Sequence, residues 1–133
     1  MRMTPELVYL LWSVALTAVL VVIAVLGATQ QLGLPKLAGN REHMPEVTGW
    51  AGRAERAHGN MLESLVLFAV LVLLARALNI SNSMTVLGAQ LFFWGRVAHA
   101  VLYIAGIAWV RTAAWAVSIV GLLLIFLQLI GQA

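Results

Sequence analysis

The sequence predicts an all-α integral membrane protein, a four-helix bundle whose chain crosses the bilayer four times. Hydrophobic residues make up 62% of the 133 residues and charged residues only 10%, whereas an ordinary soluble domain has roughly 25% charged residues. A soluble fold of this size has too little interior to bury so much apolar surface. The chain is also short enough that residues 1–133 are predicted to form a single domain.

Charge and cysteine usage exclude several classes of function. The formal net charge is +3, but a few basic residues spread over four spans make no basic face for a duplex, so we predict no nucleic-acid partner. The chain has no cysteine, which excludes disulfides, thiolate metal sites and a cysteine nucleophile. No two histidines stand four residues apart, and we therefore predict no metal site.

The first span is predicted over residues 7–28, an uncharged apolar run. Pro5 stands just before it, at a position where a helix N-terminus tolerates proline. The run is longer than the hydrophobic core of a signal peptide, which has about 7–15 residues, and no clear cleavage site follows it. We therefore expect this segment to be retained as a transmembrane helix.

The second span is the least apolar of the four. A polar segment with several glycines and prolines, residues 29–55, precedes it and is expected to form an irregular cytoplasmic loop. The uncharged run 64–75 covers only about 18 Å as a helix, whereas the bilayer core requires about 20 residues. Either this segment is not a span, or polar residues are drawn to membrane depth. We favour a span over residues 57–78, with Asn60 and Glu63 at the membrane boundary.

The third and fourth spans are predicted over residues 84–105 and 112–131. Basic residues are concentrated in the loops that follow the first and third spans: Lys36, Arg41, Arg53, Arg56 and Arg111. The termini and the remaining loop contain only Arg2 and Arg76. Because cytoplasmic loops carry an excess of Lys and Arg, both termini are expected outside and the long loop in the cytoplasm.

Two polar stripes lie toward the predicted cytoplasmic ends of the second and third spans. One comprises Arg53, Arg56, Asn60 and Glu63, and the other comprises Arg96, His99 and Tyr103. On helices these spacings confine the stripes to arcs of about 80° and about 60°. Antiparallel neighbouring helices would bring the stripes face to face, with Arg111 at the same level.

The chemistry of the stripes suggests both a clamp and a binding site. A charged residue at bilayer depth costs at least about 2.5–3.5 kcal/mol, so it requires a partner or water. Glu63 and Arg96 are expected to pair, and that pair alone can be purely structural. Arg53 and Arg56 can likewise be cytoplasmic anchors, and Tyr103 a membrane-belt residue. The surplus of arginines nevertheless favours an anionic ligand, because the guanidinium fork binds carboxylates through paired hydrogen bonds.

The segments GWAGRAERAHGNMLESL and GRVAHAVLYIAGIAWVRT resemble the MAPEG family, the membrane-associated proteins in eicosanoid and glutathione metabolism. One shared element is R-A-x-x-N-x-x-E, beginning at Arg56. The other is R-x-x-H-x-x-x-Y followed by an arginine, beginning at Arg96. The resemblance covers the whole chain and is closer to the bacterial branch than to the animal eicosanoid enzymes. It implies a multi-pass protein of the bacterial inner (plasma) membrane, with periplasmic termini.

The resemblance further implies a homotrimer that binds glutathione, as co-substrate, between neighbouring subunits. By similarity, the tripeptide would be held by Arg53, Arg56, Asn60, Glu63, Arg96, His99 and Tyr103. Arg111 would be the catalytic residue beside the sulfur, because a neighbouring cation lowers the pKa of a thiol. A lipophilic small-molecule substrate would approach from the surrounding membrane lipids.

The implied activity is that of a membrane-bound glutathione transferase, with peroxidase activity as a variant, acting on lipophilic electrophiles. Two departures from the family pattern remove positive charge from the expected glutathione site. Gly59 stands where some members carry an arginine, and Gln30 and Gln31 stand where several place one. The alternatives to an enzyme are a non-catalytic lipid-binding protein of the same fold and a small proton-coupled transporter built around Glu63.

Overall fold

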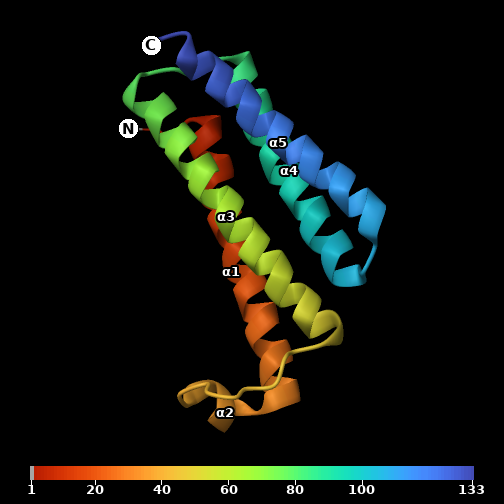
Figure 1. Ribbon diagram of the computed structural model, residues 1–133. Coiled ribbons are helices and arrows are strands. Elements are labelled where there is room, and N and C mark those ends of the chain that lie inside the picture. The colour runs from red at the N-terminus through yellow and green to blue at the C-terminus, as the bar shows by residue number, and fades with distance from the viewer. Residues whose placement is uncertain (1) are drawn as a thin grey trace.

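The computed structural model describes residues 2–133, which form five α-helices. These are α1 (Pro5–Leu32), α2 (Leu34–Ala38), α3 (Gly49–Ala77), α4 (Ser83–Ala105) and α5 (Ala108–Ile130). The four long helices run alongside one another, and α2 lies at one end of them (Figure 1). Both ends of the chain lie at the end of the bundle opposite α2, so the long loop and the termini are at opposite ends of the molecule.

Three of the helices, α1, α3 and α5, are long and apolar enough to cross a membrane. The prediction of an all-α membrane protein is therefore confirmed. Among residues 2–133, α4 is of similar length but is not in this group, and it carries Gln90, Arg96 and His99 between its apolar residues. A fourth crossing by α4 stays a prediction.

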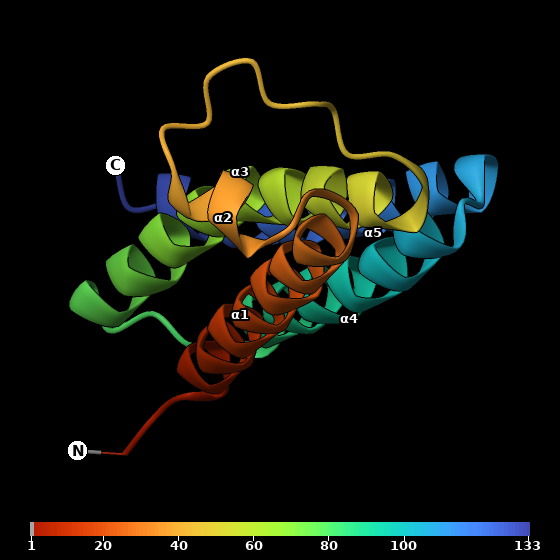
Figure 2. The same ribbon diagram turned by 90° about the horizontal axis from the view of Figure 1, so that it is seen from below.

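The predicted irregular loop is shorter than expected. α1 continues to Leu32, α2 follows at once, and α3 begins at Gly49, inside the segment 29–55 that was predicted as the loop. Pro35 stands in the first turn of α2, where its fixed φ favours a helix rather than breaking it. Seen from below, only the segment between α2 and α3 remains open, as a wide arch to one side of the bundle (Figure 2). Arg53 and Arg56 consequently lie on regular helix.

The side chain of Gln31 determines where this arch rejoins the bundle. Its Nε2 donates to the carbonyl oxygen of Thr48 at 2.7 Å, and its Oε1 accepts from the backbone N–H of Thr48 at 3.0 Å. Thr48 is the residue that precedes α3. The last turn of α1 is thereby joined to the start of α3, a function that an arginine at this position, with no acceptor, would not fulfil.

Small residues bring α4 and α5 into close backbone contact. A Cβ on Gly88 would lie 2.6 Å from the carbonyl oxygen of Gly121, and a Cβ on Gly121 would meet the carbonyl of Gly88. Further along, a Cβ on Gly95 would lie 2.9 Å from the backbone nitrogen of Ser118. In membranes, such residues drive helix association by letting backbones approach. Between α3 and α4, larger side chains fill the core, where Phe68 stacks on Phe92.

A buried carboxylate holds the end of the bundle that lies opposite α2. Glu6, in the first turn of α1, is only 2% exposed. It accepts hydrogen bonds from the hydroxyls of Ser81, at 2.9 Å, and Thr85, at 2.6 Å. Thr85 also belongs to the capping box that begins α4 at Asn82. Glu6 therefore connects the start of α1 to the start of α4, and no sequence pattern indicated this role.

We expect Glu6→Ala to lower the free energy of unfolding by about 2–3 kcal/mol, because two hydrogen bonds to a charged acceptor are lost. Glu6→Gln retains the volume and one acceptor oxygen, so its loss is expected to be smaller. Thermal unfolding in detergent, followed by circular dichroism, measures both. Glu46→Ala, in the exposed arch, is the control, and an unfolding midpoint for Glu6→Ala equal to that of this control contradicts the structural role.

Candidate functional site

The two polar stripes meet where α3 packs on α4. Arg96 Nη2 donates to Asn60 Oδ1 at 2.6 Å, which joins the stripes through one hydrogen bond. Arg96 is 1% exposed and His99 is 3% exposed. Within residues 2–133, Arg96 Nε, Arg96 Nη1 and His99 Nδ1 nevertheless have no hydrogen-bond partner. Because buried polar atoms are nearly always paired, these atoms are suited to binding a polar ligand or water.

The expected ion pair between Glu63 and Arg96 is wrong. The single hydrogen bond of the Arg96 guanidinium goes to Asn60, and its other two nitrogens have no partner among residues 2–133. Glu63 lies exposed on the surface of α3. Each residue rotates an α-helix by about 100°, so Asn60 and Glu63, which are three residues apart, lie about 60° from each other around the helix axis. Glu63 is at the edge of its stripe. The packing of α4 therefore reaches Asn60 and not Glu63.

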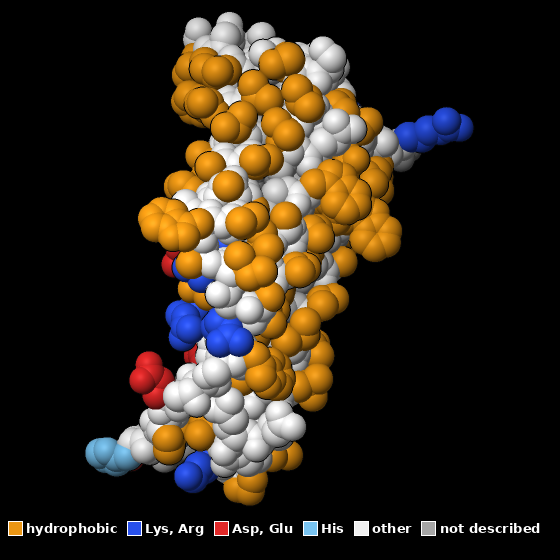
Figure 3. All heavy atoms as spheres, turned by 90° about the vertical axis from the view of Figure 1, so that its right-hand side faces the viewer, with side chains coloured by type: hydrophobic (Ala, Val, Ile, Leu, Met, Phe, Trp, Pro, Cys, Tyr) orange, Lys and Arg blue, Asp and Glu red, His pale blue; other side chains and the backbone are white. Residues whose placement is uncertain are grey.

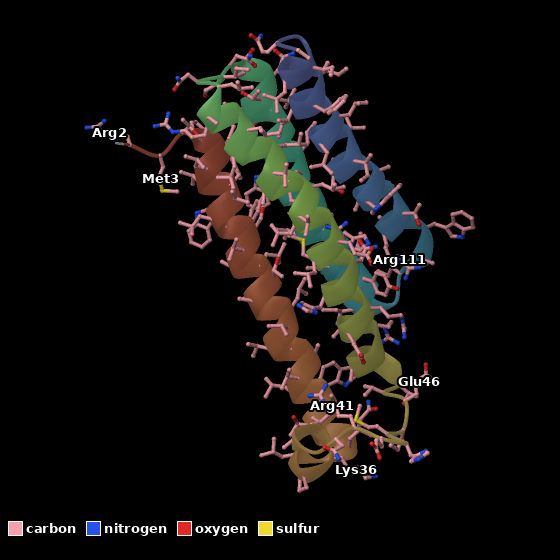
Figure 4. The ribbon with its side chains drawn as sticks, turned by 60° about the vertical axis from the view of Figure 1, so that its left-hand side comes forward. Arg2, Met3, Lys36, Arg41, Glu46 and Arg111 are labelled. Atoms are coloured by element: carbon pink, nitrogen blue, oxygen red, sulfur yellow. The ribbon has the colours of Figure 1, made fainter. Side chains whose placement is uncertain are left out.

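Arg111 is held by an aromatic ring rather than by a carboxylate. Its guanidinium carbon lies 4.3 Å from the centroid of the Tyr103 ring, a cation–π geometry. The Tyr103 ring in turn packs edge-to-face on His99, with centroids 5.5 Å apart. Arg111 stands in the first turn of α5, at the end of the α4–α5 hairpin that faces the loop (Figure 4). Lys36 and Arg41 lie beyond it, near α2.

The other arginines of the stripe differ in their environments. Arg53 is half-buried, and its Nε donates to the carbonyl oxygen of Ile104, in the last turn of α4, at 2.9 Å. Arg56, one turn further along α3, is exposed. On the face viewed from the α4–α5 side, hydrophobic side chains predominate, and most of the charged side chains gather toward the end that carries α2 (Figure 3).

The structure thus groups the predicted site residues into two sets. Contacts connect one set directly: Asn60 to Arg96 by a hydrogen bond, and His99 through Tyr103 to Arg111 by ring packing. Arg53 contacts the end of α4, while Arg56 and Glu63 are exposed on α3. The arrangement offers unpaired donors, a fixed cation and an exposed carboxylate within one region, which suits a ligand that carries both charges. Within residues 2–133, no group of three residues is placed to hold a metal ion.

A groove on the other side of α3 was not expected from the sequence. It has a volume of about 390 Å³ and lies between the end of α1, α2 and the start of α3. Its walls are mainly apolar, including Val25 and Leu37, with His58 and Arg41 among its polar residues. The breakers between residues 29 and 55 concealed α2, so no sequence signal placed these residues together.

One of three comparisons with known proteins identifies a family for this chain. The model of a family described as the MAPEG family matches residues 9–131, which include both stripes and Arg111. A search of curated proteins and a search of solved structures gave no match.

Proposed function

The chain belongs to the MAPEG family, and from this membership we propose that it is a membrane-bound glutathione transferase acting on lipophilic electrophiles. One observation supports this proposal above the others. Buried, unpaired donors of Arg96 lie on the same helix as the Tyr103 ring that holds the Arg111 guanidinium. The site therefore combines groups suited to binding an anionic ligand with a cation suited to stabilising a thiolate.

The donors present fit the functional groups of glutathione, which has two carboxylates, one ammonium group and one thiol. The free Nε and Nη1 of Arg96 and the exposed guanidinium of Arg56 suit carboxylates. Glu63, which does not pair with Arg96, is available for an ammonium group. The proposed contacts are six of those predicted from the sequence: Arg56, Asn60, Glu63, Arg96, His99 and Tyr103. The Nε of the seventh, Arg53, is bound to the carbonyl oxygen of Ile104.

Arg111 is proposed to stabilise the thiolate. A free cysteine thiol has a pKa of about 8.5, so only a few per cent is ionised at neutral pH. A neighbouring cation raises the thiolate fraction, and a guanidinium packed on an aromatic ring retains its full charge for this purpose. The sulfur then attacks the electrophilic carbon, the new S–C bond forms, and the leaving group departs with its electron pair. Reduction of a lipid hydroperoxide would begin with the same thiolate.

We further propose that the site is completed by a neighbouring subunit of a homotrimer. The exposure of Arg56 and Glu63 supports this, because a single subunit leaves charged members of the stripe uncovered. We also propose four crossings, with α4 as the third, in a bacterial inner membrane with periplasmic termini. The position of both chain ends opposite α2 supports an even number of crossings.

Purified protein in detergent should conjugate glutathione to an electrophilic aryl chloride, with a rate that saturates in glutathione. Product absorbance measures the rate against the uncatalysed reaction, and an unrelated four-span protein in the same detergent is the control. If neither aryl halides nor lipid hydroperoxides react above that background, the proposed activity is wrong.

A non-catalytic lipid-binding protein of the same fold is the second candidate. The observation that favours it is the engagement of Gln31 with Thr48, which leaves no charged side chain at a position where several members carry arginine. Titration calorimetry distinguishes the two functions, because a transferase must bind glutathione. Glutathione binding at micromolar concentration argues against this candidate, whereas binding of fatty acids without binding of glutathione supports it.

A further inference from the structure

A second hydrogen bond between α3 and α4, besides the one from Arg96 to Asn60, joins Arg53 to Ile104 close to the α4–α5 turn. Arg53 stands in the first turns of α3, and Ile104 is the penultimate residue of α4. The donor is Nε, the nitrogen nearest the aliphatic stem, at 2.9 Å from the carbonyl oxygen. An arginine whose Nε is occupied by a backbone carbonyl can present only its two terminal nitrogens to a ligand.

The end of α4 explains why a carbonyl is available there. Gly106, in the left-handed conformation with φ 81°, ends the helix. Its N–H bonds the carbonyl of Tyr103 at 3.0 Å, and the N–H of Ile107 bonds that of Leu102 at 2.9 Å. These bonds satisfy earlier carbonyls of the last turn, while the carbonyl of Ile104 receives the hydrogen bond from Arg53. A cation is also electrostatically favoured at a helix C-terminus.

The Arg53 side chain also packs directly against Gly106. A Cβ on Gly106 would lie 3.5 Å from Arg53 Nε and 3.6 Å from its Cζ. The guanidinium therefore lies over the turn, as well as bonding to it. The turn is short: α5 begins at Ala108, and Arg111 stands in its first turn. On the other side, Tyr103, which carries the Arg111 guanidinium on its ring, directly precedes Ile104.

We propose that Arg53 is a positioning residue that holds the turn between α4 and α5, and thereby places Arg111 over Tyr103. It acts through the backbone of Ile104 and does not bind the ligand carboxylates. This inference rests on the proposed transferase function for the role of Arg111, and it changes the predicted contact set at one position. The exposed Arg56, on the same helix, keeps the role of ligand contact.

Two substitutions at Arg53 test the proposal, with Arg56→Met as the matched control. Arg53→Met removes every donor and is expected to speed amide hydrogen exchange over residues 104–108 at least about fivefold, since the turn loses its tie to α3. Arg53→Lys keeps a donor for the carbonyl and is expected to exchange at the wild-type rate. Arg56→Met should leave exchange in this turn unchanged. Mass spectrometry of the purified protein in detergent makes this measurement without a ligand.

Kinetics with glutathione and an aryl chloride separate positioning from binding. Arg53→Met is expected to lower kcat about tenfold and to change the KM for glutathione less than about twofold, whereas Arg56→Met should mainly raise KM. Arg53→Lys should retain both wild-type constants, although a lysine does not reproduce a guanidinium fork on a carboxylate. If Arg53→Met does not fold, Arg53→Lys alone decides between positioning and binding.

Failure of the inference is distinct from failure of the proposed function. Wild-type exchange in Arg53→Met, or a KM raised at least about tenfold by Arg53→Lys with kcat unchanged, overturns the positioning role. A wild-type protein that neither binds nor conjugates glutathione overturns the proposed function. In that case the exchange measurement still decides whether Arg53 holds the turn.

Discussion

Replacing Arg111 with alanine is expected to lower kcat/KM for glutathione conjugation by about 10²–10³-fold, the usual effect of removing one preorganised group that stabilises developing or reacting charge. The reason is that Arg111 is the cation held on the Tyr103 ring, at 4.3 Å, in the region where the thiol is proposed to lie. Binding of glutathione should change much less, because the carboxylate contacts are made by other arginines. Stopped-flow or steady-state kinetics, with calorimetry for binding, measures both quantities.

The pH dependence provides a second readout of the same substitution. Without the cation, the apparent pKa of the bound thiol should move up toward its free value of about 8.5. The activity of Arg111→Ala should therefore recover in part as the pH rises, more than that of the wild type. Arg111→Lys, which keeps the charge but not the planar fit on the ring, is expected to be intermediate.

Arg76→Ala is the matched control for loss of an arginine. Arg76 stands in the last turn of α3, at the end of the bundle away from the site, and its replacement should leave activity unchanged. If Arg111→Ala conjugates at the wild-type rate with an unchanged pH profile, Arg111 does not stabilise the thiolate, and the assignment of the catalytic residue is wrong.

Replacing Gly121 with valine is expected to destabilise the protein by about 3 kcal/mol, the upper part of the usual range for overpacking. The Cβ itself would meet the backbone carbonyl of Gly88, and a backbone atom cannot move aside as a flexible side chain can. α4 and α5 would have to separate along their length, and Gly95 would then lose its contact with Ser118. The unfolding midpoint in detergent measures this effect.

Gly59→Ala is the control for adding a side chain to a helical glycine. A Cβ on Gly59 would meet nothing within 4 Å, and alanine in a helix interior is favoured over glycine by about 1 kcal/mol. This variant should therefore be as stable as the wild type or slightly more stable. An unfolding midpoint of Gly121→Val equal to that of the wild type would show that α4 and α5 do not meet through their backbones.

Prediction from the sequence was most successful for features that depend on composition and helical period. The membrane class follows from the apolar content, and the three helices apolar enough to cross a membrane were all predicted as spans. The spacing of the polar residues along the sequence predicted that the two stripes face each other, and the hydrogen bond between Asn60 and Arg96 confirms that they meet. α2 and the first turns of α3 lie inside the segment 29–55 that was predicted as an irregular loop, because Gly49 and the other breakers before it were interpreted as loop residues.

Only the tertiary structure decided which residue each polar side chain binds. Asn60 rather than Glu63 binds Arg96, and Arg53 reaches a backbone carbonyl on α4 that no side-chain pattern reveals. Glu6 is buried against Ser81 and Thr85, which lie far from it in the sequence.

The physical reason is that the sequence determines the properties of single helices but not how the helices are rotated and shifted against one another. The sequence alone determined that this chain is helical, lies in a membrane and carries two polar stripes, because apolar content and the 3.6-residue period are properties of single segments. Which member of a stripe meets which partner depends on the rotation and offset of one helix against another. Contacts between distant segments, such as the stacking of Phe68 on Phe92 between α3 and α4, set that offset. Only the folded bundle therefore determined which donors are paired and which remain available for a ligand.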